Sequence, residues 1–171
     1  MDRTEQDALY EEARSSWGAA LQRLARGYEL DPERRRDLVQ EMHIQLWRSL
    51  ASFDRRCSLR TWVYRVSNNV GATHIIQQRR AARLVDLESL EPDMISAMNQ
   101  TDAQYCAGQL LELIHRLKPI DRQIMLLYLE GETAGAIAEV GGLSSSNVAT
   151  KIHRIKKLLK QQYLEGINAE K

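Results

Sequence analysis

The chain has 171 residues, of which 43% are hydrophobic, and its formal net charge is +1. This length suits one ordinary domain or two small ones, and the composition allows a packed core. No apolar run approaches the roughly 18 residues that a membrane span requires, and the first seven residues are polar and acidic, unlike a signal peptide. We therefore expect a cytoplasmic protein without membrane insertion.

The cysteines and histidines do not form a metal-binding pattern. Cys57 and Cys106 stand far apart, and neither has a second Cys or His beside it at ligand spacing. We therefore expect two reduced thiols, no metal and no cofactor. The sequence also contains no catalytic cluster and no phosphate-binding loop, which predicts a protein that is not an enzyme.

Three helices are predicted in the first 80 residues. Apolar side chains recur at helical spacing over 4–28, 33–51 and 59–80. Before the second helix, Asp31 can act as N-cap and Pro32 suits the first helical position. Trp62 falls on the apolar face of the third helix, so we expect it in the core.

The segment 81–102 has the composition of a linker, because it is acidic and contains Pro92 and several small polar residues. Beyond it, helical patterns run from 103 to about 117, over 120–130 and 133–140, and from 144 or 145 to about 163. No strand pattern appears. The sequence therefore predicts an all-α protein with two small helical domains, 1–80 and 103–171, joined by an acidic linker.

The last two predicted helices form a helix-turn-helix candidate, because the turn Gly141-Gly142 separates them and the second helix is basic. Residues 144–162 contain five lysines or arginines and no acid. With the apolar residues on one side, the opposite side offers cations for phosphates and hydrogen-bonding groups for base edges. A solvated charged face is the alternative interpretation of this pattern.

The third predicted helix carries a different polar face. Arg60, Tyr64, Arg65 and Asn68 lie opposite its apolar side, and residues 54–80 contain six arginines and one acid. Bases stack on aromatic rings while cations follow the phosphates, so this combination is typical of a single-strand binder. Asn68 and Asn69 carry both donors and acceptors and could read a base extracted from the duplex.

The second predicted helix places Asp37, Glu41 and Arg48 on one side with Ile44 among them. An exposed aliphatic side chain framed by charges suits a protein–protein contact. An isolated exposed isoleucine is also common on ordinary surfaces, so both interpretations remain open here.

These motifs, taken in order, resemble the sigma-70 family of bacterial RNA polymerase. Asp37 to Glu41, with Leu46-Trp47 and Phe53-Asp54, resembles the family's core-binding signature, and Leu59 to Asn69 looks like the segment that melts the −10 element. The motifs similar to the −35-reading domain are Leu117 to Pro119, Glu130-Gly131-Glu132, Ile137-Ala138-Glu139, Gly142-Leu143-Ser144, Val148 and His153-Arg154. The size is similar to the extracytoplasmic-function (ECF) group, and the resemblance covers nearly the whole chain.

The resemblance implies a sigma factor that directs promoter recognition and transcription initiation, with a region 2-like domain over 1–80 and a region 4-like domain over 103–171. The residues implied in binding the polymerase are Asp37, Gln40, Glu41, Ile44 and Arg48. Those implied at the −10 element are Arg60, Tyr64, Arg65, Asn68, Asn69, Arg79 and Arg80. Those implied at the −35 element are Ser145, Ser146, Asn147, Thr150, Lys151, Arg154 and Lys157.

The implied partners are promoter DNA and core RNA polymerase, through the clamp of its largest subunit and its flap, with an anti-sigma factor as a further candidate. The acidic linker would follow the RNA exit path of the polymerase. Two other functions fit parts of the sequence: a helix-turn-helix regulator that acts without polymerase, and a helical adaptor without a DNA role. The arginine, tyrosine and asparagine face at 60–69 argues against the first, and the second would leave the basic last helix incidental.

Overall fold

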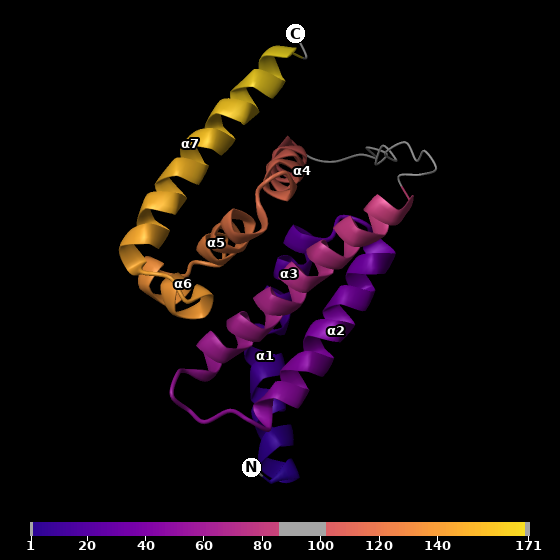
Figure 1. The fold of residues 1–171 in the computed structure, drawn as a ribbon, viewed down its shortest axis with the longest axis vertical. Coiled ribbons are helices and arrows are strands. Elements are labelled where there is room, and N and C mark those ends of the chain that lie inside the picture. Colours follow the sequence, from indigo (N-terminus) through magenta and orange to yellow (C-terminus); the bar gives the residue numbers. More distant parts are fainter. Residues whose placement is uncertain (1, 86–101, 170–171) are drawn as a thin grey trace.

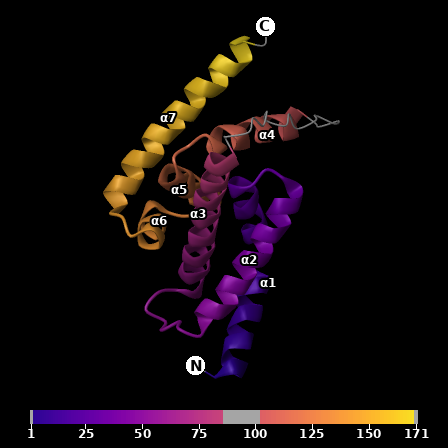
Figure 2. The same ribbon diagram turned by 45° about the vertical axis from the view of Figure 1, so that its right-hand side comes forward.

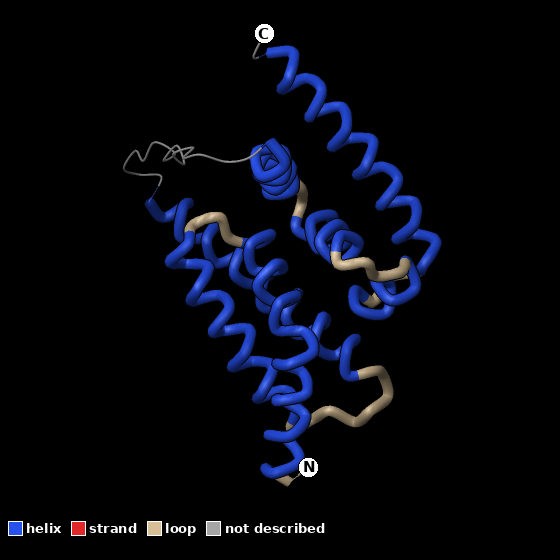
Figure 3. Tube along the Cα trace, turned by 180° about the vertical axis from the view of Figure 1, so that it is seen from behind, coloured by secondary structure: helices blue, strands red, loops and turns tan. Residues whose placement is uncertain are grey.

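The computed structural model describes residues 2–85 and 102–169, and within these ranges it contains seven α-helices and no strand (Figures 1 and 3). The helices are α1 (Arg3–Tyr28), α2 (Pro32–Leu50), α3 (Leu59–Val85), α4 (Asp102–His115), α5 (Pro119–Leu129), α6 (Ala134–Gly141) and α7 (Ser145–Ala169). The all-α prediction is confirmed. Most of the predicted acidic linker falls on residues 86–101, outside the described part of the chain.

Helices α1, α2 and α3 pack side by side around Leu24, Met42 and Val63 (Figures 1 and 2). The start of α2 is the predicted one: the Asp31 side chain accepts a hydrogen bond from the Arg34 backbone N–H at 2.8 Å, and Pro32 is the first helical residue. The Trp62 ring packs against Phe53, with ring centroids 5.2 Å apart, at the edge of this core.

Helices α4 to α7 form the second group around Ile124, Ile137 and Ile155. The Thr133 hydroxyl caps α6 by accepting from the Ala136 N–H at 3.2 Å. Gly142 ends α6 in the left-handed conformation, with φ 65°, where glycine carries no steric penalty. The resulting turn directs α7 away from α6 and completes the predicted helix-turn-helix.

The two groups are in contact along α3, which lies between α1 and α2 on one side and α5 and α6 on the other (Figure 2). The approach is close enough that a Cβ atom on Gly27 would overlap the side chain of Leu126 in α5. None of the described helices is both long enough and apolar enough to cross a membrane.

Gly71 is required for the packing of α1 against α3, because a Cβ atom there would overlap the buried ring of Tyr28. We expect Gly71→Ala to lower the free energy of unfolding by about 1–3 kcal/mol, the usual cost of overpacking. Gly18→Ala is the matched control, since nothing lies within 4 Å of a Cβ at Gly18. It should raise the free energy of unfolding by up to ~1 kcal/mol through helix propensity. Urea titration measures both, and equal effects of the two substitutions would contradict this packing.

Candidate nucleic-acid and polymerase interfaces

Helix α7 presents the polar face that the sequence predicts for DNA recognition. Val148, Ile152, Ile155 and Leu159 are buried against α5 and α6. The opposite side is exposed, and it carries Ser146, Asn147, Thr150, Arg154 and Lys157, while Ser145 is exposed at the start of the helix. Lys151 is the exception among the predicted −35 residues, because its side chain is only 22% exposed.

A buried carboxylate explains the position of Lys151. Asp121 of α5 accepts a hydrogen bond from Lys151 Nζ at 2.8 Å and another from Arg154 Nη2 at 3.1 Å. The Asp121 side chain is 10% exposed. Asp121 was not predicted as a functional residue, because nothing in the sequence indicates that an acid after Pro119 lies beneath a helix 30 residues further on.

The predicted −10 residues on α3 divide into an exposed set and a buried set. Arg60, Asn69, Arg79 and Arg80 are exposed, and Arg65 is half-buried. Tyr64 and Asn68 are 2% and 0% exposed. The prediction that these two lie on an open face is therefore wrong for this arrangement. The two residues are buried for different reasons: Asn68 is bonded to Tyr28 inside the first group of helices, and Tyr64 lies where α3 meets the second group.

Asn68 has a structural role within the first group of helices. Its Oδ1 accepts from the Tyr28 hydroxyl at 2.6 Å, and its Nδ2 donates to the Tyr64 carbonyl at 2.8 Å. Burial raises the pKa of the Tyr28 phenol, so this hydroxyl remains a donor. With both polar groups of its amide bonded and no exposed surface, Asn68 is not available to read a base.

Tyr64 is buried near the carboxylates of the turn between α5 and α6. Burial raises the pKa of the Tyr64 phenol, and the nearby carboxylates of Glu130 and Glu132 raise it further. These two acids also pair with arginines of the first group. Arg23 donates to Glu130 through Nε and Nη2 at 2.8 and 2.7 Å, and Arg60 Nε donates to Glu132 at 2.7 Å.

The contact between the two groups combines apolar packing, with Leu126 against Gly27, and polar pairs at its edge. Arg65 Nη2 donates to the Glu139 carbonyl at 2.9 Å, and the side chains of Glu130 and Glu132 are only 8% and 9% exposed. Arg122 is also buried. It donates to the His115 carbonyl, its Nε has no hydrogen-bond partner among the described residues, and burial lowers the pKa of its guanidinium. A buried cation with incomplete pairing reduces the stability of such an interface.

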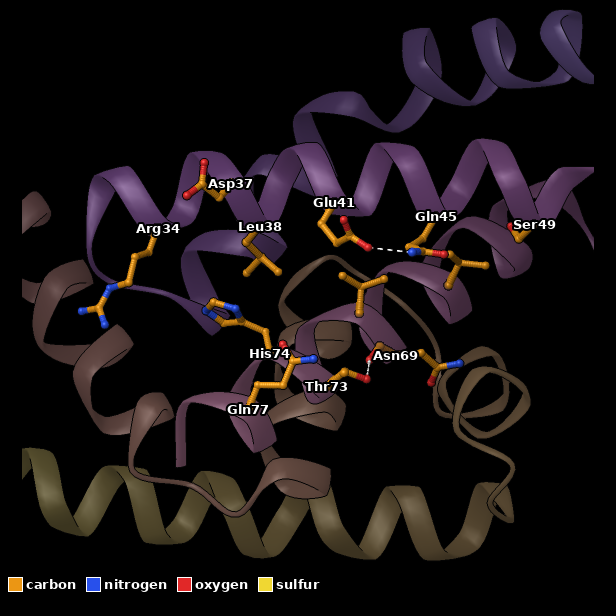
Figure 4. Close-up of a pocket in the computed structure, with 12 residues that line it drawn as sticks. Arg34, Asp37, Leu38, Glu41, Gln45, Ser49, Asn69, Thr73, His74 and Gln77 are labelled. Atoms are coloured by element: carbon orange, nitrogen blue, oxygen red, sulfur yellow. Dashed lines mark hydrogen bonds between the residues drawn. The ribbon is translucent and has the colours of Figure 1, made fainter. Parts of the chain in front are cut away.

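A groove runs between α2 and α3 on the other side of α3 (Figure 4). The predicted polymerase-binding acids Asp37 and Glu41 line its α2 side. Asn69, which was predicted to read the −10 element, lines its α3 side. All five predicted polymerase-binding residues, Asp37, Gln40, Glu41, Ile44 and Arg48, are exposed along α2. The groove therefore lies between the two surfaces that the sequence assigns to protein and to DNA.

Glu29 fixes one end of this groove. Its carboxylate, in the connection between α1 and α2, lies 2.9 Å from His74 Nε2 and also accepts from the Gln78 amide. Burial alone would raise the pKa of Glu29, but hydrogen bonds from His74, the Asp31 N–H and Gln78, with the nearby charge of Arg34, lower it overall.

Two models of the sigma-70 family match the chain: Sigma-70 region 2 over residues 15–81 and Sigma-70, region 4 over residues 107–159. The ECF RNA polymerase sigma-E factor of Haemophilus influenzae is 25% identical over 137 residues, which cover 74% of this chain and 72% of that protein. The probable RNA polymerase sigma factor RfaY of Xanthomonas campestris pv. campestris is 25% identical over 138 residues, which cover 75% of this chain. This match spans only 34% of RfaY.

Two solved structures share the fold. The sigma factor RpoE of Bartonella quintana, in complex with the anti-sigma factor NepR, has a TM-score of 0.71 at 17% identity, covering 89% of this chain and 94% of that one. CnrH in complex with the cytosolic domain of CnrY has a TM-score of 0.67 at 21% identity, covering 95% and 96%.

The fold and the exposed face of α7 define a two-part helical protein with a helix-turn-helix. The two matched regions together cover well over half of the chain. The chain belongs to the sigma-70 family and is an RNA polymerase sigma factor of the ECF group.

The Glu29 network gives a pH-dependent contribution to stability. Because the folded pKa of Glu29 lies below its ordinary value of 4.5, the contribution is complete above that pH and is lost as the pH falls through the lowered folded pKa. We expect Glu29→Gln to lower the free energy of unfolding by about 1–3 kcal/mol at pH 7, and by progressively less below pH 4.5. Urea titration across this range measures the difference. The exposed Glu33→Gln is the control, and a pH-independent effect at Glu29 would contradict the assignment.

Proposed function

We propose that this chain directs core RNA polymerase to promoters in the cytoplasm by reading the −35 element with α7 and capturing the opened −10 strand with α3. The observation that carries the proposal is the division of α7 into a fully packed apolar side and an exposed side of cations, hydroxyls and an amide. Such a face fits the major groove, where cations contact phosphates and the amide and hydroxyls contact base edges. The chain needs no chemistry of its own.

On α3, the exposed side chains of Arg60, Asn69, Arg79 and Arg80 are the candidates for the −10 strand. Asn69 is the best candidate for a base pocket, because its amide is exposed while that of Asn68 is not. Arg79 and Arg80 would contact the backbone. Binding energy for the extracted bases would offset part of the cost of melting, which is a few kcal/mol per base.

The α2 surface is the candidate for the clamp of the polymerase largest subunit. Ile44 is 36% exposed at its centre, with Asp37, Glu41 and Arg48 around it. An apolar centre within a charged rim is the usual anatomy of a protein–protein interface. The second group of helices would contact the polymerase flap, and the predicted acidic linker over 81–102 would follow the RNA exit path.

The contact between the α5–α6 turn and α3 implies a step before DNA binding. Glu130 pairs with Arg23, Glu132 pairs with Arg60, and Tyr64 is buried beside them. Part of the predicted −10 face is therefore unavailable to DNA in this arrangement. We propose that the two groups separate when the chain joins the polymerase. The similar RpoE and CnrH were solved with NepR and CnrY, and a comparable anti-sigma partner is proposed for this chain.

The experiment that tests the proposal adds the purified chain to core polymerase and maps transcript start sites on genomic DNA. We expect start sites that share a −35 and a −10 element at fixed spacing. Duplex binding without polymerase and no new start sites would instead support the helix-turn-helix regulator.

The α2 assignment is tested by charge reversal. Asp37→Arg should abolish binding to core polymerase, measured by co-purification, because it places a cation at an exposed position of the proposed interface. Glu12→Arg makes the same charge change at an exposed position on α1 and should leave binding intact. Unchanged affinity of a folded Asp37→Arg variant would remove α2 from the polymerase interface.

The contact of the α5–α6 turn with the first group of helices is tested by the double variant Glu130→Gln and Glu132→Gln. This variant removes the two carboxylates that pair with Arg23 and Arg60. We expect tighter binding to single-stranded DNA by the chain alone, because Arg23, Arg60 and Tyr64 become available. Fluorescence anisotropy with an unstructured oligonucleotide measures this. Glu11→Gln and Glu12→Gln together change the charge equally on α1 and serve as the control. No gain over that control would contradict the proposed step.

A further inference from the structure

We infer that Asp121 is a positioning residue for promoter recognition: its carboxylate orients Arg154 across the DNA-facing side of α7 and makes Lys151 a support instead of a DNA contact. This inference rests on the proposed function of α7. It concerns an α5 residue that lies outside the helix-turn-helix itself.

The geometry allows one carboxylate to hold both cations. Asp121 lies in the first turn of α5, which packs against α7. Lys151 and Arg154 are three residues apart in a helix and therefore lie on the same face. Asp121 Oδ1 accepts from Lys151 Nζ at 2.8 Å, and Oδ2 accepts from Arg154 Nη2 at 3.1 Å. Each oxygen of the carboxylate thus has its own cation.

The two cations differ in what remains available for DNA. Lys151 is 22% exposed, and its ammonium is directed at a carboxylate that is itself 10% exposed. Arg154 is 66% exposed and, within the described structure, is held through Nη2 alone. Its Nε and Nη1 can therefore still donate to a base edge, with the plane of the guanidinium already oriented. Restricting a flexible side chain before binding lowers the entropy cost of the contact.

The carboxylate also changes the balance between specific and non-specific binding. It neutralises about one positive charge beneath the recognition face, so fewer cations are available for phosphates than the sequence count suggests. Phosphate contacts carry no sequence information, whereas an oriented guanidinium can read guanine. Asp121 therefore favours sequence discrimination over general affinity for DNA.

The test compares the wild type with Asp121→Asn, each assembled with core polymerase. The probes are a duplex carrying the −35 element from the mapped promoters and the same duplex with that element scrambled. We expect the preference for the −35 duplex to fall on the order of 5- to 10-fold. Binding to the scrambled duplex should become stronger, and the slope of log affinity against log salt should steepen by about one, because one more cation reaches a phosphate.

The control and conservative variants separate positioning from a purely structural role. Glu112→Gln removes an exposed acid from α4 and should keep both the preference and the salt slope. Asp121→Glu retains the charge and should keep the wild-type salt slope while recovering part of the preference. In a double-mutant cycle, Arg154→Ala should lower the preference by itself, and adding Asp121→Asn should lower it little further.

A folded Asp121→Asn variant, verified by circular dichroism, that keeps the wild-type preference and salt slope would overturn the inference. If Asp121→Asn does not fold, an Asp121→Glu variant with a steepened salt slope would overturn it equally. Failure of the proposed function is distinguishable from both, because the wild type itself would then show no preference for the −35 duplex over the scrambled one.

Discussion

Helix α3 is packed on two opposite sides, and the other contacts of the molecule depend on this arrangement. One side is closed by α1 and α2, where the Tyr28 hydroxyl and the Asn68 amide form a buried hydrogen bond. The other side is closed by the α5–α6 turn, whose carboxylates pair with Arg23 and Arg60. The first contact is internal to the helical core, whereas the second combines apolar packing of Leu126 against Gly27 with ion pairs between nearly buried carboxylates and exposed arginines.

The ion pairs bear on the proposed separation of the two groups of helices. Ion pairs near the surface contribute little net free energy, because water and salt compete for the same charges. The partly paired, buried Arg122 lowers the stability of the closed form further. A new partner can therefore replace these contacts at modest cost. In the proposed complex, phosphates of the opened strand would lie where the carboxylates of Glu130 and Glu132 lie now. The arginines would therefore face negative charge both in this arrangement and in the proposed complex.

Helix α7 is also paired with an acid of the same chain, because Asp121 holds Lys151 and Arg154. Asp121 lies beneath α7 as Glu132 lies against α3, and each carboxylate is directed at a cation that the sequence assigns to DNA. The two contacts differ in whether they lie within one group of helices or between the two groups. Asp121 is buried within the second group, whereas Glu130 and Glu132 face the other group and would leave α3 in the proposed separation.

The sequence by itself determined the helices, the cap at Asp31, the packing of Trp62 against the core and the basic face of α7, because local spacing decides all of these. It also determined the family, through motifs that are local. Only the tertiary structure decided that Tyr64 and Asn68 are buried and that Asp121 restrains Lys151 and Arg154. Helical periodicity separates an apolar face from a polar one, but it carries no information on which distant segment covers the polar face.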